Sequence, residues 1–194
     1  MPSFPVPLAT LASSWSDGTS VLALSRIVVQ VYLVRHARPE FGAGGAYHLP
    51  PGPPLTDTAR EQAAAVARLL AQVPIARVVS SPLRRCLMTA EPIGAQLGLD
   101  LQGDPDLGEQ QPGEVPTSVA VRMVRAVLNQ SAVPGVALVS HAGPLEQLLG
   151  AVVQDRLVLP PPDARGCRLG VASVWHVQRR GGLWQAGAVA PAAG

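Results

Sequence analysis

The sequence predicts an α/β fold, a three-layer α/β/α sandwich around a mostly parallel central sheet. Short apolar segments rich in Val alternate with helical patterns along the chain, and strands that are buried on both faces of a parallel sheet have this composition. Helices between such strands cover the two faces of the sheet. The 194 residues are the usual length of one domain. We expect a weakly ordered leader over 1–26 and one domain over 27–194.

The first half of the domain contains two strand–helix pairs. Residues 27–34 form a β-branched, apolar run that predicts a central strand. A helix is expected after the N-cap Thr56, because apolar residues then recur at helical spacing. These residues are Ala59, Ala63, Val66, Leu70 and Val73. Residues 75–80 repeat the strand pattern, and Ser81 as N-cap with Pro82 at the first helical position predicts a helix that ends near Leu97.

The second half continues the alternation. A short strand over 99–101 and an acidic loop lead to a helix expected over 117–129, and a buried strand follows over 135–140. In the helix over 117–129, the side expected to be buried comprises Ala120, Val121, Val124, Val127 and Leu128. A helix that begins at Gly143 is expected to point Leu145, Leu148, Leu149 and Val152 inward. Two final strands are expected around 168–177 and 183–189.

Charge and cysteine usage exclude several classes of function. The net charge is +2 and all 15 basic residues are scattered Arg residues, so we expect no nucleic-acid or anionic-membrane partner. The absence of Lys excludes a P-loop lysine and Schiff-base chemistry. Cys86 and Cys167 lack the spacing of a disulfide framework or a metal site. The longest apolar run, 27–34, is too short to cross a bilayer. We expect a cytoplasmic protein that uses no metal and no cofactor.

Two histidines, His36 and His141, each follow directly on a predicted buried strand. The ligand crevice of an open α/β sheet lies at the carboxyl ends of its strands, so the two imidazoles should meet there. A third strand end delivers Arg84 and Arg85 on the first turn of a helix. Imidazoles, guanidinium groups and free helix N-termini together bind a tetrahedral oxyanion. The sequence therefore predicts a phosphate-binding crevice.

Four segments, in this order, resemble the histidine phosphatase superfamily, which is also called the phosphoglycerate mutase-like family. They are Leu-Val-Arg-His-Ala at 33–37, and the segments 54–63, 80–91 and 139–143. A fifth segment, 107–114, is similar to a weakened form of the family's acid-donor segment. The resemblance covers roughly residues 27–180. It implies a phosphoglycerate mutase-like sandwich and a catalytic domain.

The resemblance also implies roles for individual residues. His36 would be the nucleophile that is transiently phosphorylated, and Glu109 the general acid that protonates the leaving oxygen. The phosphoryl group would be held by Arg35, Arg85, His141 and Ala142. Glu114 remains the rival of Glu109, and Arg84 is expected to be a solvated or ion-paired helix residue.

Some positions depart from the family pattern. Ala37 replaces a glycine, so the backbone there loses tolerance for unusual angles. The loop that contains Tyr47 and His48 replaces the usual basic substrate loop. These two side chains either line the mouth of the pocket or face solvent.

The expected function is that of a metal-independent phosphohydrolase. It would cleave a phosphorylated small molecule or a phosphopeptide through a phosphohistidine on His36. A phosphoglycerate mutase-like phosphotransferase is the first alternative, disfavoured because too few residues separate Glu109 from His141 to form the insertion that shields the phosphoenzyme in mutases. A phosphate-binding regulatory module without turnover is the second. The sequence predicts neither the natural substrate nor the oligomeric state.

Overall fold

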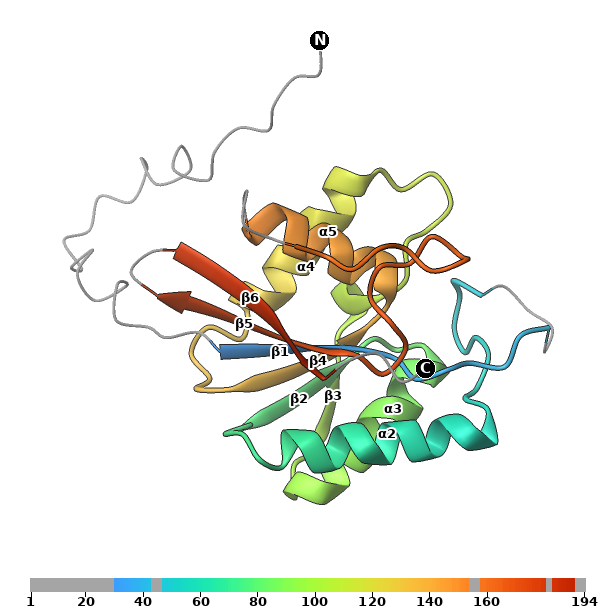
Figure 1. Ribbon diagram of the computed structural model, residues 1–194, viewed down its shortest axis with the longest axis horizontal. Helices are drawn as coiled ribbons and strands as arrows, with labels where there is room; N and C mark the ends of the chain where they lie inside the picture. Colours follow the sequence, from blue (N-terminus) through green and yellow to red (C-terminus); the bar gives the residue numbers. More distant parts are fainter. Residues whose placement is uncertain (1–29, 43–46, 154–157, 181–182, 191–194) are drawn as a thin grey trace, which may run out of the picture.

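The computed structural model describes residues 30–42, 47–153, 158–180 and 183–190 (Figure 1). The expected leader over 1–26 lies outside these residues. Within them, one sheet has the strand order β3-β2-β4-β1-β5-β6. Its strands are β1 (Gln30–Arg35), β2 (Arg77–Ser80), β3 (Leu101–Gly103), β4 (Val136–Ser140), β5 (Val174–Arg180) and β6 (Leu183–Ala190). The strands β3, β2, β4 and β1 run parallel to one another, β5 pairs antiparallel with β1, and β6 pairs antiparallel with β5. The predicted mostly parallel sheet is confirmed.

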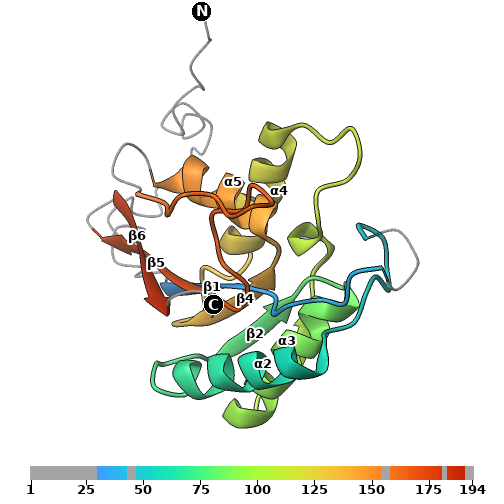
Figure 2. The ribbon, with the colours of Figure 1, turned by 45° about the vertical axis from the view of Figure 1, so that its right-hand side comes forward.

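Helices cover both faces of the sheet, which gives the three layers (Figure 2). α2 (Asp57–Leu70) and α3 (Arg84–Leu97) lie on one face, and α4 (Pro116–Leu128) and α5 (Ala142–Val152) on the other. Side chains of β1 alternate between the two resulting cores: Val31 and Leu33 pack with α4 and α5, whereas Tyr32 and Val34 pack with α2 and α3. No helix in the described ranges is long and apolar enough to cross a membrane.

Local sequence signals explain where two of the helices start and stop. Thr56 caps α2 as predicted, and its hydroxyl accepts a hydrogen bond from the Ala59 N–H at 3.3 Å. The predicted start of α3 is wrong, because the capping position is Leu83. The Ser81 hydroxyl accepts a hydrogen bond from the Leu83 N–H at 3.4 Å and also contacts His141. The helix ends at Gly98, whose left-handed φ of 66° suits glycine.

The buried face of α4 also differs from the prediction. Val121 is 65% exposed and Leu128 is 56% exposed. The fully buried positions are Val119, Met123, Ala126 and Val127, so only Val127 was assigned correctly as buried, while Ala120 and Val124 are half-buried. Because apolar residues occupy most positions of this helix, its sequence offers two overlapping apolar faces, and packing against α5 selects one of them.

Residues 168–173 form turns rather than the start of the penultimate strand, which begins at Val174. Their backbone is engaged with the end of β1. The carbonyl of Ser173 accepts a hydrogen bond from the Arg35 N–H at 3.1 Å, and the carbonyl of Leu169 accepts one from the Arg35 guanidinium. Ala172 adopts a positive φ of 56°, which is uncommon for a residue other than glycine. This segment therefore braces the strand end that leads into the predicted crevice.

Candidate active site

The sheet brings the two predicted histidines together. β1 and β4 are adjacent and parallel, and Arg35 pairs with Ser140 in their register. His36 and His141 are the next residues, and the His36 N–H donates to the Ser140 carbonyl at 3.0 Å. The imidazole centroids lie 5.2 Å apart with the rings at 60°. The two rings thus meet at the carboxyl edge of the sheet, because two neighbouring strands end in the same register.

His36 has one defined tautomer. Its Nδ1 lies 2.7 Å from the Ala37 carbonyl, which only accepts hydrogen bonds, so Nδ1 carries the proton and Nε2 has a free lone pair. Burial, followed by the positive charge of Arg85, lowers the pKa of His36 from 6.5 to about 3. A neutral imidazole with an unprotonated Nε2 is a competent nucleophile.

Ala37 fits this position without a glycine. Among the described residues, Ala172 is the only non-glycine residue with a positive φ, so the backbone at Ala37 is not in the left-handed region. Its N–H donates to Thr89 Oγ1 at 3.0 Å, and its methyl group is completely buried. The departure from the family's glycine therefore costs no backbone strain here.

The two ring nitrogens of His141 face different partners. Arg85 Nη2 lies 3.0 Å from Nδ1, and because a guanidinium only donates, Nδ1 must accept. The proton is therefore on Nε2, which donates to the Ser81 hydroxyl at 2.9 Å. The pKa of His141 is well below its ordinary value, mainly because the side chain is buried and also because His36 and Arg85 lie close to it. Ser81, predicted as a helix cap, is thus the residue that fixes the tautomer of His141.

The adjacent arginines Arg84 and Arg85 have opposite environments. Arg84 is exposed, whereas Arg85 has no exposed side-chain surface. The Arg85 guanidinium donates to the Tyr47 carbonyl at 2.8 Å and to Glu109 Oε2 at 3.2 Å, in addition to His141. Its Cζ lies 4.0 Å from the centroid of the Tyr47 ring. Arg85 therefore connects the predicted acid, the second histidine and the Tyr47 loop.

A cavity of about 320 Å³ opens beside His36. Four of the predicted site residues line it, namely Arg35, His36, Glu109 and Ala142, and so do Phe41, Tyr47, Gly143, Arg165 and Cys167. Arg85 and His141 do not line it, but Arg85 contacts Glu109 and the ring of His141 lies beside that of His36, so both adjoin residues of the cavity wall. Ala142 is the first residue of α5, so the helix N-terminus adds partial positive charge to the cavity wall.

The two candidate acids, Glu109 and Glu114, occupy different places. Glu109 lines the cavity, with 19% of its side chain exposed. Glu114 forms an ion pair with Arg122 at 2.7 Å, and the hydrogen bond from Arg122 lowers the pKa of Glu114. Arg122 also donates to the carbonyls of Gly108 and Glu109 at 2.9 and 3.3 Å. The geometry favours Glu109 for contact with a substrate and makes Glu114 part of the anchor of its loop.

Aromatic and cationic groups surround the mouth of the cavity. The Tyr47 and Phe41 rings are stacked with centroids 6.4 Å apart, and Arg165 Cζ lies 3.8 Å from the Phe41 ring centroid. Tyr47 therefore lines the pocket, whereas His48 does not line it and accepts a hydrogen bond from Gln111 through its carbonyl. Sequence reasoning did not identify Phe41 or Arg165, since neither lies in a recognisable motif. No three His, Cys, Asp or Glu side chains gather as metal ligands in the described part of the chain.

Comparisons with known proteins agree with this geometry. The family model of the Histidine phosphatase superfamily (branch 1) matches residues 31–118. An uncharacterized protein of Mycobacterium tuberculosis is 45% identical over 80 residues, which is 41% of this chain and 40% of that protein. A probable phosphoglycerate mutase of Escherichia fergusonii is 36% identical over 90 residues, 46% of this chain and 42% of that protein. The matched segment thus spans about two fifths of the length of these relatives.

Solved structures extend the likeness to most of the domain. A mycobacterial glucosyl-3-phosphoglycerate phosphatase superposes with a TM-score of 0.67 at 22% identity, covering 83% of this chain and 98% of that one. YhfR of Bacillus stearothermophilus gives a TM-score of 0.68 at 21% identity, covering 84% and 98%. A phosphoglycerate mutase of Bacillus anthracis gives 0.62 at 16% identity, covering 86% and 94%. The predicted phosphoglycerate mutase-like fold is confirmed.

Proposed function

Since residues 31–118 belong to the histidine phosphatase superfamily (branch 1), we propose that the protein is a phosphomonoester hydrolase that works through a phosphohistidine on His36. The observation that carries the proposal is the tautomer of His36. Its Nδ1 proton is donated to the Ala37 carbonyl, so Nε2 presents a lone pair where His36 lines the cavity. The substrate is a phosphorylated small molecule or a phosphopeptide, and no metal or cofactor takes part.

In the first step, Nε2 of His36 attacks phosphorus while the ester oxygen departs on the opposite side. Glu109 gives its proton to that oxygen, so the alcohol leaves neutral. Arg35 and the N-terminus of α5 at Ala142 face the phosphoryl oxygens from the cavity wall. Arg85 holds Glu109 and His141 in place from the interior side.

In the second step, water attacks the phosphoryl group and the bond between phosphorus and Nε2 breaks. The Glu109 carboxylate accepts a proton from that water, inorganic phosphate leaves, and His36 returns to its neutral form. Every group in this cycle ends in its starting state, so the enzyme turns over without a co-reactant.

Hydrolysis is preferred to phosphate transfer because of the chain between Glu109 and His141. That stretch forms the loop to Val115, then α4 and β4, and these are layers of the sandwich itself. It adds no separate insertion above the cavity that would keep water from the phosphohistidine. The matched relatives include a glucosyl-3-phosphoglycerate phosphatase of Mycolicibacterium vanbaalenii as well as probable phosphoglycerate mutases, so the preference rests on this stretch of chain.

The test is turnover of p-nitrophenyl phosphate in the presence of EDTA. His36→Asn keeps a polar side chain of similar size without the nucleophilic nitrogen, and should abolish turnover together with the 32P-labelled phosphohistidine trapped by rapid alkaline quench. The matched control is His48→Asn, which removes a histidine outside the cavity and should leave the rate unchanged. Activity retained in His36→Asn would overturn the mechanism. Phosphate binding without any wild-type turnover would instead favour a regulatory module.

The neighbouring arginines provide a second matched pair. Arg85→Ala should lower kcat by a factor of order 10², because Glu109 and the buried His141 lose a charged donor. Arg84→Ala removes an exposed guanidinium and should change kcat less than twofold. Equal losses in the two variants would show that the loss reflects damage to α3 rather than a role of Arg85.

A further inference from the structure

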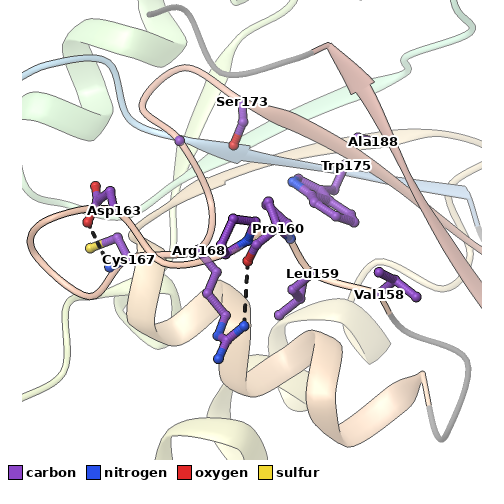
Figure 3. A pocket seen from close by; sticks show the side chains of 11 residues that line it. Val158, Leu159, Pro160, Asp163, Cys167, Arg168, Ser173, Trp175 and Ala188 are labelled. Atoms are coloured by element: carbon purple, nitrogen blue, oxygen red, sulfur yellow. Dashed lines mark hydrogen bonds between the residues drawn. The ribbon is translucent and has the colours of Figure 1, made fainter.

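A second cavity, of about 660 Å³, lies between residues 158–173 and the strands β5 and β6 (Figure 3). Small-molecule sites in proteins have this size, roughly 300–1,000 Å³. Most of its wall is apolar, formed by Val158, Leu159, Pro160, Pro161, Trp175 and Ala188. Cys167 borders both this second cavity and the cavity beside His36. Arg35, His36 and Glu109 line only the cavity beside His36. We call the second cavity the Trp175 cavity.

One polar group in its wall has no partner. Ser173 is 3% exposed, and its Oγ makes no hydrogen bond within the described part of the chain. Figure 3 shows this hydroxyl on the side of Pro160 and Trp175. A buried hydroxyl without a hydrogen bond costs free energy of the order of 1–3 kcal/mol. A ligand that supplied the missing partner would recover that cost.

The two charged side chains that line the Trp175 cavity, Asp163 and Arg168, are exposed. The Asp163 carboxylate accepts hydrogen bonds from the N–H groups of Arg165 and Cys167 at 2.8 and 2.9 Å, which lower the pKa of Asp163. The Arg168 guanidinium is turned to the Pro160 carbonyl, at 3.5 Å. Both charged side chains are exposed to solvent, where a single ion pair contributes little to binding. The buried part of the wall offers apolar surface, one aromatic ring and one hydroxyl.

We propose that the Trp175 cavity binds an uncharged small molecule with a flat apolar body and a single hydroxyl or carbonyl group. The body packs against Trp175 and Pro160, and the polar group forms a hydrogen bond with Ser173 Oγ. The Trp175 cavity is separate from the cavity beside His36. It is nevertheless adjacent to the end of β1, because the backbone carbonyl of the same Ser173 accepts a hydrogen bond from the Arg35 N–H.

The test uses two probes of the same shape, 2-naphthol and 2-methylnaphthalene, titrated by calorimetry into the full chain. 2-Naphthol should bind saturably, and Ser173→Ala should weaken it about tenfold, the value of one hydrogen bond. The affinity for 2-methylnaphthalene, which has no hydroxyl, should not change in Ser173→Ala. An equal loss for both probes, or no saturable binding of 2-naphthol, would overturn the proposal.

A filling variant locates the bound probe. Ala188→Trp places a large side chain in the wall of the cavity and should abolish binding, whereas Gln185→Trp adds the same side chain at an exposed position of β6 that does not line the cavity. Saturating inorganic phosphate should leave the 2-naphthol affinity unchanged. Displacement by phosphate, or binding that survives Ala188→Trp, would place the probe elsewhere and overturn the proposal. Neither experiment depends on phosphatase turnover.

Discussion

The ring of Tyr47 lies against the guanidinium of Arg85, with the Arg85 Cζ 4.0 Å from the ring centroid. The Tyr47 carbonyl accepts a hydrogen bond from the same guanidinium at 2.8 Å. Arg85 in turn donates to Glu109 and His141. The Tyr47 loop therefore reaches the proposed chemistry through one buried cation.

We predict that Tyr47→Ala lowers kcat/KM for p-nitrophenyl phosphate about tenfold, because a desolvated cation–π contact contributes roughly 1–2 kcal/mol. Tyr47→Phe keeps the ring and should stay within about twofold of wild type. Steady-state kinetics on the two variants checks this. If Tyr47→Phe loses as much as Tyr47→Ala, the phenol hydroxyl rather than the ring is the important group.

For the proposed acid, the prediction is a difference between substrates. Glu109→Gln should reduce hydrolysis of an alkyl phosphate by a factor of about 10² or more, the usual contribution of general acid catalysis. Turnover of p-nitrophenyl phosphate should fall far less, because its leaving group needs little protonation. Glu114→Gln disturbs the contacts that anchor this loop, with Arg122 and the Gln111 N–H, so it should affect both substrates equally. A substrate-dependent loss in Glu114→Gln, and a uniform one in Glu109→Gln, would reverse the assignment.

Acid pH should destabilise the fold through His36. Its pKa is lowered to about 3 in the folded state by burial and by Arg85, whereas the pKa of a histidine in the unfolded chain is about 6.5. Between these values the unfolded chain binds a proton that the folded chain does not, so the free energy of unfolding falls as the pH falls. From about pH 7 to about pH 5, this one group should account for a loss of roughly 2 kcal/mol.

Urea unfolding of wild type and His36→Asn at the two pH values measures that contribution. The loss of stability on acidification should be smaller in His36→Asn by roughly this 2 kcal/mol. Arg84→Ala changes a charge without removing an imidazole, so on acidification its free energy of unfolding should fall as much as that of wild type. An identical pH dependence in His36→Asn and wild type would mean that His36 is already solvated in the folded protein.

The buried face of α4 gives a stability prediction. Met123 is completely buried in the core between α4, α5 and the sheet, whereas Val121 on the same helix is 65% exposed. Met123→Ala should therefore lower the free energy of unfolding by about 2–5 kcal/mol, and Val121→Ala should change it by less than about 0.5 kcal/mol. Chemical denaturation measures both. A larger loss of stability in Val121→Ala than in Met123→Ala would mean that the face predicted from the sequence is the buried one.

The sequence predicts features that are encoded locally. Each of the two histidines of the candidate site follows an apolar β-branched run, so their common edge of the sheet could be inferred from the strand pattern alone. The choice of Arg85 over Arg84 came from the resemblance, and the structure buries the former and exposes the latter.

Other features depend on contacts between distant segments and could not be predicted. Ser81 meets His141 across 60 positions, and Tyr47 meets Arg85 across 38. The serine looked like a helix cap because Ser-Pro is a common helix start. The face of α4 was ambiguous because apolar residues occupy most of its surface, and only its packing partner distinguishes the two faces.

The spacing of the two imidazoles is set by the pairing of β1 with β4, which lie in the middle of the sheet. Loosening of a surface loop cannot separate His36 from His141, because that would require two central strands to part. Such central strands open only when the whole domain unfolds. On slow heating, the histidine pair should therefore persist up to the melting transition itself, so activity lost below that transition would come from the loops that hold Glu109 and Tyr47.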